Sequence, residues 1–271
     1  MPLSQRLFDL TGRGVFVTGA LGRLGCVWVE TALHAGAWVL AFDREGVSVS
    51  PSFSALARKY KGRLVLERGD VTSRRDLEKA RGHCRKRVPL AVVVNNAGID
   101  SPPAILKKNP IFSEIPLEDV RRTFEVNFLG AFQVLQVFGE GLASSGMGSA
   151  INIGSLYSVV SPDQRFYDHL PVQPPFLKPP AYGASKAALA NLTQFLSTLW
   201  GPTGVRVNTL SPGGVEGGQD VHFKSKFTAR VPLGRMATLD DLRGPFLFLA
   251  SDASRYVTGV NLMVDGGFTT W

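Results

Sequence analysis

The chain has 271 residues, 44% of them hydrophobic, and a formal net charge of +8 at neutral pH. This length, with alternating strand and helix patterns and no repeat, linker or charge block, predicts one α/β domain spanning residues 1–271 and gives no sign of a second domain. The basic residues are scattered without interleaved aromatic residues, which favours a solvated surface over nucleic-acid binding, although positive charge also helps to attract an anionic substrate.

The first ten residues lack the apolar run of a signal peptide, and no stretch approaches the ~20 apolar residues of a membrane span. We therefore expect a soluble, cytoplasmic protein with no membrane partner. The two cysteines, Cys26 and Cys84, belong to no metal motif, so no metal site is expected.

The first predicted strand, residues 14–18, opens into the glycine turn Gly19-Ala-Leu-Gly22-Arg-Leu-Gly25. A helix is predicted next, and its first amides and positive dipole end would face the turn, where a pyrophosphate can bind. A glycine-rich turn alone fits a purely structural turn equally well. The candidate cofactor residues in this segment are Thr18, Gly19, Gly22, Arg23 and Leu24.

The second predicted strand, residues 37–42, ends at Asp43. In dinucleotide-binding folds, an acid at about this distance beyond the glycines binds the adenosine ribose hydroxyls, and its charge repels the 2′-phosphate of NADP. Asp43 therefore favours NAD. Arg44 and Arg23 keep NADP possible, because a guanidinium can pair with a 2′-phosphate. The alternative is that both arginines are solvated surface charges.

Tyr182 and Lys186 are four residues apart, a spacing that would place a phenol and an ammonium on one side of a helix. A nearby cation favours the phenolate and lowers the tyrosine pKa from its ordinary value of ~10. Such a tyrosine can exchange a proton with an alcohol or ketone while a cofactor carries the hydride. Taken alone, the pair also fits a chance spacing on a solvated helix.

Eight short motifs occur in the order typical of one family. They are Thr18-Gly19, Gly69-Asp70-Val71, Asn95-Asn-Ala-Gly98, Asn127 within Val-Asn-Phe-Leu-Gly, Ser155 after a predicted strand, the Tyr182/Lys186 pair, Ser211-Pro-Gly213 and Val264-Asp-Gly-Gly267. On these motifs the chain resembles the short-chain dehydrogenases/reductases over nearly its whole length. The resemblance implies a single-domain, Rossmann-like doubly wound parallel sheet, a nicotinamide cofactor, a homodimer or homotetramer, and a catalytic tetrad of Asn127, Ser155, Tyr182 and Lys186.

Individual roles follow in part from the residues and in part from the resemblance. Ser155, at the carboxyl end of a predicted strand, would hydrogen-bond the substrate oxygen, and Lys186 would also donate to the nicotinamide ribose. For Asn127, within a helical pattern, a structural contact of the amide is weighed against the family's role of holding a proton-relay water. Asp70 would accept from the adenine amino group, or cap a helix. The other candidate cofactor residues are Val71, Asn96, Ala97, Gly98, Pro212, Gly213 and Val215.

Two departures from the family pattern concern the cofactor side. Arg23 stands where the second glycine is usual, and Gly22 takes over that role. Gly217 stands in place of the usual threonine, within a glycine-rich stretch that predicts a mobile lid over about residues 214–230.

A third departure is an insert, residues 157–180, which about doubles the usual separation of Ser155 from Tyr182. Such a loop is either a flap on a neighbouring subunit or a wall of the substrate site. Tyr157, Gln164 and Arg165 are its candidate substrate residues, beside Ser155 and Tyr182. Arg165 is expected to face the cleft, because a guanidinium pairs well with phosphate or carboxylate.

Residues 161–165, 211–220, 231–236 and 264–271 are similar to a bacterial branch associated with surface-sugar biosynthesis, including legionaminic-acid-type pathways. The chain is thus predicted to be an NAD(P)-dependent oxidoreductase that interconverts a secondary alcohol and a ketone on a polar, sugar-phosphate-like or nucleotide-sugar-like small molecule. Two alternatives stay open. One is a carbonyl or 3-oxoacyl thioester reductase using NADPH, and the other is a catalytically silent dinucleotide-binding scaffold. A last strand is predicted over residues 257–265, followed by an aromatic tail that either reaches a neighbouring subunit or is frayed.

Overall fold

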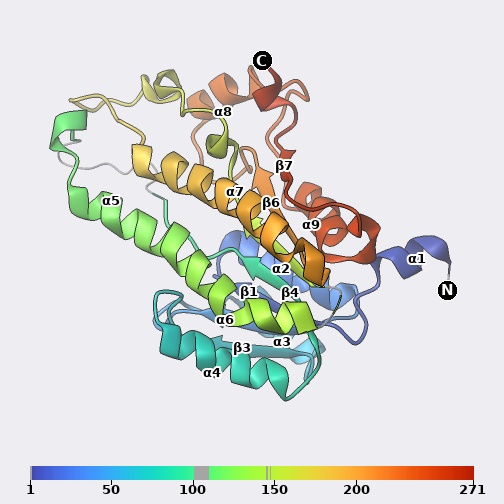
Figure 1. Cartoon of the computed structure of the whole chain (residues 1–271). Helices are drawn as coiled ribbons and strands as arrows, with labels where there is room; N and C mark the ends of the chain where they lie inside the picture. The colour runs from blue at the N-terminus through green and yellow to red at the C-terminus, as the bar shows by residue number, and fades with distance from the viewer. Residues whose placement is uncertain (1, 101–109, 145, 147) are drawn as a thin grey trace.

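The computed structural model describes residues 2–100, 110–144, 146 and 148–271. In this part of the chain, seven strands form one sheet in the order β3-β2-β1-β4-β5-β6-β7, and each neighbouring pair is parallel (Figure 1). The predicted Rossmann-like, doubly wound parallel sheet is confirmed.

The strands are β1 (Gly14–Thr18), β2 (Trp38–Asp43), β3 (Leu64–Arg68), β4 (Leu90–Asn95), β5 (Ser149–Ile153), β6 (Arg206–Pro212) and β7 (Asn261–Val264). The α-helices of the described residues are α1 (Leu3–Phe8), α2 (Arg23–His34), α3 (Pro51–Lys59), α4 (Arg74–Arg85), α5 (Leu117–Phe124), α6 (Ala131–Ser144), α7 (Pro180–Trp200), α8 (Val221–Thr228) and α9 (Arg243–Ala250).

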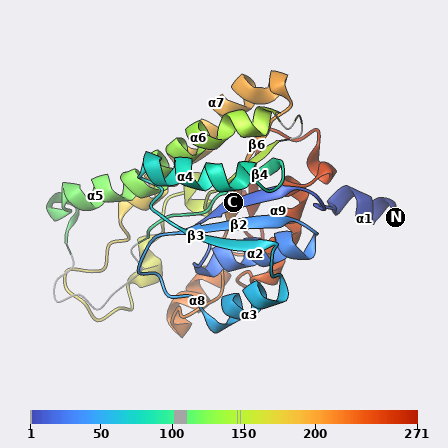
Figure 2. The same cartoon turned by 90° about the horizontal axis from the view of Figure 1, so that it is seen from below.

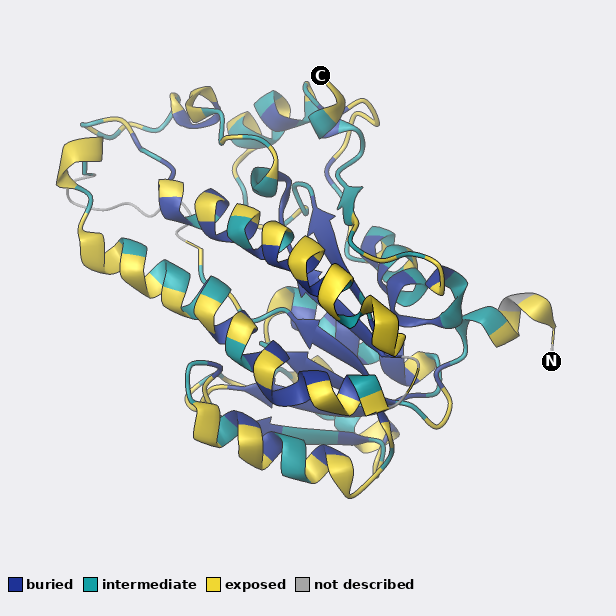
Figure 3. Cartoon of the chain, viewed as in Figure 1, coloured by how far each residue is buried: buried dark blue, intermediate teal, exposed yellow. Residues whose placement is uncertain are grey.

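Helices cover both faces of the sheet. Every residue of β1, β2, β4 and β5 is buried, and parallel strands buried in this way need an apolar layer on each side. One layer contains α2, α3 and α9, and the other contains α4, α6 and α7 (Figure 2). Figure 3 shows the buried strands between helices whose outer faces are exposed. The core therefore lies on both sides of the sheet and holds the strand ends rigidly.

The strand order reverses between β1 and β4, which are neighbours although β2 and β3 come between them in the chain. At such a point the connections after the two strands diverge, and open α/β sheets bind ligands in the resulting crevice at the carboxyl edge. The glycine turn follows β1, and Asn96–Gly98 follow β4. The topology therefore brings these two predicted cofactor motifs together.

The C-terminal strand is shorter than predicted. Val257 closes a turn on Ser254, and Gly259 has φ of 77°, so the strand begins only at Asn261.

The two aromatic residues of the C-terminal tail differ in burial. Phe268 is buried and stacks on Phe227 of its own chain at 4.8 Å between ring centroids, whereas Trp271 is 74% exposed. Phe268 therefore belongs to the core of this chain.

Among the described helices, none has the length and apolar character needed to cross a bilayer.

Candidate active site

A cavity of about 800 Å³ lies along the carboxyl edge of the sheet. Motifs that are far apart in the sequence meet in its lining. Among the predicted cofactor residues these are Gly19, Gly22, Arg23, Leu24, Asp43, Arg44, Asp70, Val71, Asn96, Ala97, Gly98, Pro212, Gly213 and Val215, and among the predicted catalytic residues Ser155, Tyr182 and Lys186.

Thr18 and Asn96 hold the glycine turn against the end of β4. Thr18 is buried outside the cavity lining, and its Oγ1 accepts from the amides of Asn96 and Ala97, each at 3.1 Å. The side-chain amide of Asn96 donates to the carbonyls of Thr18 at 3.0 Å and Gly19 at 2.9 Å. Gly19 has φ of 60°, and an added Cβ would lie 2.8 Å from Ala97 Cα. The side chain of Thr18 thus supports the turn and does not face the cavity.

Asp43 and Asp70, the two carboxylates predicted to contact the adenosine part of the cofactor, line the cavity. Asp43 is 8% exposed, and its oxygens accept from the amides of Leu21 at 2.8 Å and Arg44 at 2.9 Å. These bonds fix the carboxylate beside the glycine turn, and a carboxylate has further acceptor positions for ribose hydroxyls. Asp70 accepts from both the amide and the hydroxyl of Thr72 at 2.8 Å, and so also stabilises its own turn.

Arg23 joins the glycine turn to the segment predicted as a lid. Its guanidinium donates to the carbonyl of Glu216, and an added Cβ at Gly217 would lie 2.5 Å from its Nη1. Arg23 therefore fills the space that a side chain at position 217 would need. This contact relates the two cofactor-side departures, an arginine in place of glycine and a glycine in place of threonine. The mobility of residues 214–230 stays a prediction.

Ser155, Tyr182 and Lys186 converge where β5 ends and α7 begins. The Ser155 hydroxyl is hydrogen-bonded to the Tyr182 phenol and accepts from the amide of Tyr157 at 3.2 Å. Lys186 is buried, and its Nζ donates to the carbonyl of Ile153 at 2.7 Å and lies 5.8 Å from the centroid of the Tyr182 ring. The four-residue spacing on α7 does place phenol and ammonium on one side of the helix.

Burial dominates the electrostatics of this pair. It raises the pKa of the Tyr182 phenol above its ordinary value, with the Asp100 charge adding to the rise and the Ser155 hydrogen bond opposing it. Burial also lowers the pKa of Lys186 to about 8, against the charge of Asp100. The expectation that Lys186 lowers the tyrosine pKa is wrong for this structure, because desolvation of the phenol and the nearby charge of Asp100 raise that pKa.

Asn127 lies in a π-helical turn, Glu125–Gly130, between α5 and α6, where the sequence predicted ordinary helix. Its buried side chain accepts from the amide of Ile99 at 2.7 Å and donates to the carbonyl of Ile99 at 3.0 Å and to Ser185 Oγ at 3.1 Å. Such turns are frequent at functional sites. The structural contact considered for Asn127 is present, and its part in a proton relay stays a prediction.

The insert packs on its own chain. Phe166, Tyr167 and Phe176 are buried in one cluster with Phe227 of α8 and Phe268 of the tail. This cluster holds the insert beside the active-site end of α7 without requiring a neighbouring subunit.

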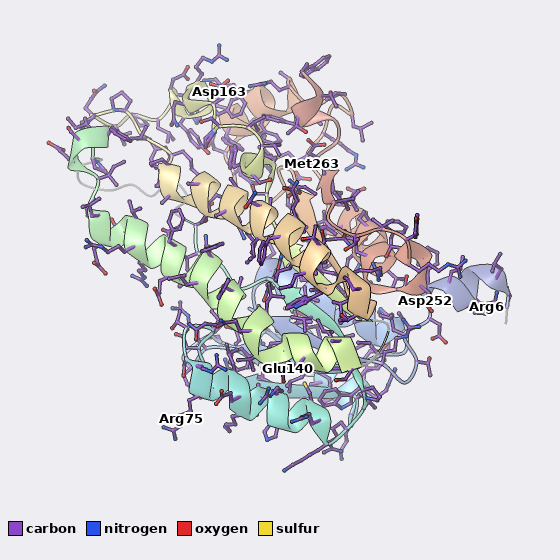
Figure 4. All side chains as sticks on the ribbon, viewed as in Figure 1. Arg6, Arg75, Glu140, Asp163, Asp252 and Met263 are labelled. Carbon is purple, nitrogen blue, oxygen red and sulfur yellow. The ribbon has the colours of Figure 1, made fainter. Side chains whose placement is uncertain are left out.

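The candidate substrate residues of the insert lie outside the cavity lining. The hydroxyl of Tyr157 is hydrogen-bonded to Tyr167, and the side chain of Gln164 accepts from the backbone amide of Lys178 at 3.0 Å. Arg165 is 82% exposed and makes two hydrogen bonds to Asp163, at 2.9 and 2.7 Å. Figure 4 shows Asp163 on the insert at the top of the view. The expectation that Arg165 faces the cleft is wrong, because a carboxylate two residues away captures its guanidinium.

An acidic residue of the site was not identified from the sequence. Asp100 lines the cavity and lies near Tyr182, whose pKa its charge affects. Lys178 of the insert is 5% exposed, and its Nζ donates to both carboxylate oxygens of Asp100 at 2.6 Å. The same Nζ lies 5.5 Å from the centroid of the Tyr182 ring. The only sequence signal for Asp100 is its place directly after the Asn95–Gly98 motif and Ile99.

The described residues fit a dinucleotide. Asp43, the glycine turn and Lys186 all line this one cavity, and they are the residues expected to contact the adenosine ribose, the pyrophosphate and the nicotinamide ribose. An added Cβ at Gly98 would lie 3.3 Å from Asn127 Oδ1 and 3.5 Å from Lys186 Nζ, so a side chain at this position would crowd both groups. When bound, the nicotinamide supplies the hydride acceptor or donor, and the residues of the chain hold the substrate oxygen and move the proton.

Comparison with known families agrees with this geometry. The family described as "short chain dehydrogenase" matches residues 13–168. The chain belongs to this family. A second family, described as "Enoyl-(Acyl carrier protein) reductase", matches residues 172–269. This short-chain dehydrogenase is therefore an NAD(P)-dependent oxidoreductase.

Relatives of known activity resemble this short-chain dehydrogenase over their full length. It is 30% identical over 269 residues to the NAD-dependent glycerol dehydrogenase of Listeria innocua, covering 97% of this chain and 96% of the relative. It is 29% identical over 275 residues to the galactitol 2-dehydrogenase (L-tagatose-forming) of Cereibacter sphaeroides, covering 98% and 99%.

Two solved structures show the same fold. The gluconate 5-dehydrogenase of Burkholderia cenocepacia in complex with NADP and tartrate has a TM-score of 0.82 and 27% identity, covering 99% of both chains. A short-chain dehydrogenase of Leptospira borgpetersenii with bound NAD+ has a TM-score of 0.82 and 30% identity, covering 99% of this chain and 96% of that one. Such structures thus bind either NAD or NADP.

Proposed function

We propose that this short-chain dehydrogenase oxidises a secondary hydroxyl of a polyol or sugar-type substrate with NAD, and reduces the corresponding ketone in the reverse direction. One observation carries the proposal: the hydrogen-bonded Ser155 and Tyr182 share a cavity wall with the carboxylate of Asp100. In oxidation, Tyr182 takes the hydroxyl proton and Ser155 holds the oxygen. A wall with these polar groups suits a substrate that carries several hydroxyls, and the relatives named for glycerol and galactitol support this class.

The narrower resemblance, to a surface-sugar branch of the legionaminic-acid type, is kept as a more specific form of this proposal. The relatives reported above are named for polyols and give it no direct support. A phosphorylated or nucleotide-linked sugar therefore belongs in the test set. We also propose a cytoplasmic location, which is consistent with the absence of membrane-spanning helices among the described residues.

A substrate panel tests the proposed function. The purified chain is mixed with NAD or NADP and with glycerol, threitol, galactitol, gluconate, a sugar phosphate or a nucleotide sugar, and the reduced nicotinamide is followed by absorbance. Oxidation of at least one polyol or sugar is expected. Turnover of a 3-oxoacyl thioester with NADPH and of no polyol would support the reductase alternative. Nucleotide binding without any turnover would support the silent scaffold.

Cofactor preference is expected to change when Asp43 is replaced. Asp43→Asn keeps the shape and an acceptor oxygen for the Leu21 amide but removes the charge that repels a 2′-phosphate. The ratio of the dissociation constants for NADH and NADPH should shift toward NADPH by roughly tenfold or more, about 1.4 kcal/mol. Fluorescence titration of both nucleotides measures the ratio. Tighter binding of NADPH than NADH by the unmodified chain would contradict the role given to Asp43.

The quaternary prediction is a homodimer or homotetramer. Supporting it, Phe195 and Leu199 on α7 are 62% and 55% exposed, and Leu129 and Phe132 near the start of α6 are 43% and 37% exposed. Exposed large apolar side chains that gather on one face commonly mark an interface. Light scattering at micromolar concentration should give at least twice the mass of one chain, and a monomer would reject the proposal.

A further inference from the structure

The buried ion pair between Lys178 and Asp100 connects the insert to the reaction centre. Gln164, from the middle of the insert, accepts from the backbone amide of Lys178 at 3.0 Å and so fixes the returning segment just before α7. From there the Lys178 side chain reaches Asp100 across 78 positions of sequence, with both bonds at 2.6 Å. The ion pair therefore forms only because the insert supplies Lys178 and the fold brings it to Asp100.

The residue before Asp100 in the chain is also fixed in place. Both backbone polar groups of Ile99 are bonded to the side chain of Asn127, at 2.7 and 3.0 Å. Asp100 thus follows directly from a fixed residue, its side chain remains 39% exposed, and it lines the same cavity as Ser155 and Tyr182. The ammonium of Lys178, in contrast, is buried behind it at 5% exposure.

A carboxylate at this position is electrostatically unfavourable for the reaction unless its charge is compensated. Proton uptake by Tyr182 requires the phenolate, and a nearby negative charge disfavours that form. The ammonium of Lys178, 5.5 Å from the Tyr182 ring centroid, offsets the charge of Asp100. A neutral residue at position 100 would avoid the conflict altogether, and the pairing of this carboxylate with a buried ammonium at 2.6 Å is what keeps a charged acceptor beside the reaction centre.

We propose that Asp100 is a specificity-determining residue whose carboxylate accepts hydrogen bonds from hydroxyl groups adjacent to the reacting carbinol, and that Lys178 is the positioning residue that holds this carboxylate. The inference rests on the proposed function and names the part of the site that selects a polyol over a simple alcohol. The carboxylate of Asp100 is 39% exposed and lines the cavity beside Ser155 and Tyr182, where a hydroxyl of the substrate can reach it while Lys178 holds it from the insert. The insert is then a substrate wall, acting through Lys178.

The test compares two four-carbon probes, threitol and 2-butanol, which share a secondary hydroxyl but differ in the neighbouring hydroxyls. For the unmodified chain, kcat/KM should be higher for threitol. Asp100→Asn should lower the ratio of the two kcat/KM values by roughly tenfold, the cost of one lost charged hydrogen bond, mainly through KM for threitol. Asp100→Asn takes this carboxylate away from the buried Lys178 ammonium. The double variant Asp100→Asn/Lys178→Met, which removes both charges, is therefore measured as well. Its ratio of kcat/KM values should fall by the same factor.

The positioning role of Lys178 has a separate readout in the pH profile. The groups that face Tyr182 are Ser155, Tyr157, Asp100, Lys178 and Lys186. In Lys178→Met, the Asp100 charge is no longer offset by this ammonium and should move the limb of the kcat profile that reports the tyrosine to higher pH. Lys178→Arg should restore the profile of the unmodified chain, and the double variant should return close to it, because the carboxylate is then gone too. Arg165→Ala, an exposed charge of the same insert, is the control and should change neither readout.

The outcomes separate the two proposals. If the unmodified chain oxidises no polyol of the panel, the proposed function fails. If it oxidises threitol but the ratio changes by less than about twofold in both Asp100→Asn and the double variant, the inference is overturned while the proposed function stands. A pH profile that is the same in Lys178→Met and the unmodified chain would overturn the positioning role.

Discussion

Tyr182→Phe is expected to lower kcat at least ~10²-fold, the usual contribution of a positioned general acid or base, with the cofactor dissociation constant nearly unchanged. Phenylalanine keeps the packing of the ring in α7 but lacks the hydroxyl, which is bonded to Ser155 and lines the cavity. Because the phenylalanine ring cannot accept the proton of the substrate hydroxyl, the loss should appear in kcat more than in KM. Steady-state kinetics with the best substrate of the panel, together with nucleotide titration, measure both quantities.

A matched control separates the loss of this hydroxyl from a general effect of the substitution. Tyr256 is fully exposed, and Tyr256→Phe should keep the kcat of the unmodified chain. Activity of Tyr182→Phe close to that of the unmodified chain would eliminate Tyr182 as the proton carrier. A normal melting temperature of the inactive variant would show that chemistry, and not folding, had been removed.

The cofactor side of the cavity could be predicted because each of its motifs follows directly on a strand. Parallel strands end on one edge of the sheet, so Asp43 at the end of β2 and the glycine turn after β1 had to meet. Thr18 shows the limit of this reasoning. Whether a strand-end side chain points into the cavity or back toward its neighbour depends on a partner such as the Asn96 amide, which lies 78 positions away in the sequence.

The substrate side could not be predicted in the same way. The insert contains several charged residues, and their partners are chosen by tertiary packing. Arg165 bonds Asp163 within its own turn, whereas Lys178 bonds Asp100, which lies 78 positions away in the sequence. The partners of Asn127 are likewise set by tertiary packing, since its side-chain amide bonds both backbone polar groups of Ile99. Residue type indicated the importance of the insert but not which of its cations faces the reaction centre.

Lys186→Met is expected to lower kcat and weaken cofactor binding, and also to remove a pH-dependent part of the free energy of unfolding. Burial lowers the pKa of Lys186 from 10.5 to about 8 in the folded chain. Below the window between these two pKa values, the lysine is protonated in both the folded and the unfolded chain, and burying its charge lowers the free energy of unfolding. Between the two pKa values the unfolded state holds the proton and the folded state has released it, so the free energy of unfolding rises with pH, by about 3 kcal/mol in total.

The measurement compares the free energy of unfolding of the unmodified chain with that of Lys186→Met, by denaturant titration at a series of pH values from neutral to alkaline. The difference, unmodified chain minus variant, should become more positive by about 3 kcal/mol as pH rises through the window. Loss of the bond to the Ile153 carbonyl acts at every pH at which that bond is made and cannot produce a rise of this sign. Lys61→Met, at an exposed position, should show no such slope.

Catalysis and nucleotide binding give the second half of this prediction. A methionine side chain has no N–H to donate, so Lys186→Met should weaken binding of NAD and lower kcat together, in contrast to Tyr182→Phe, which should affect kcat alone. A flat stability difference across the alkaline range would contradict a desolvated ammonium at this position. A variant that binds NAD as tightly as the unmodified chain would instead contradict the role of Lys186 in the cofactor site, which rests on its place in the cavity lining.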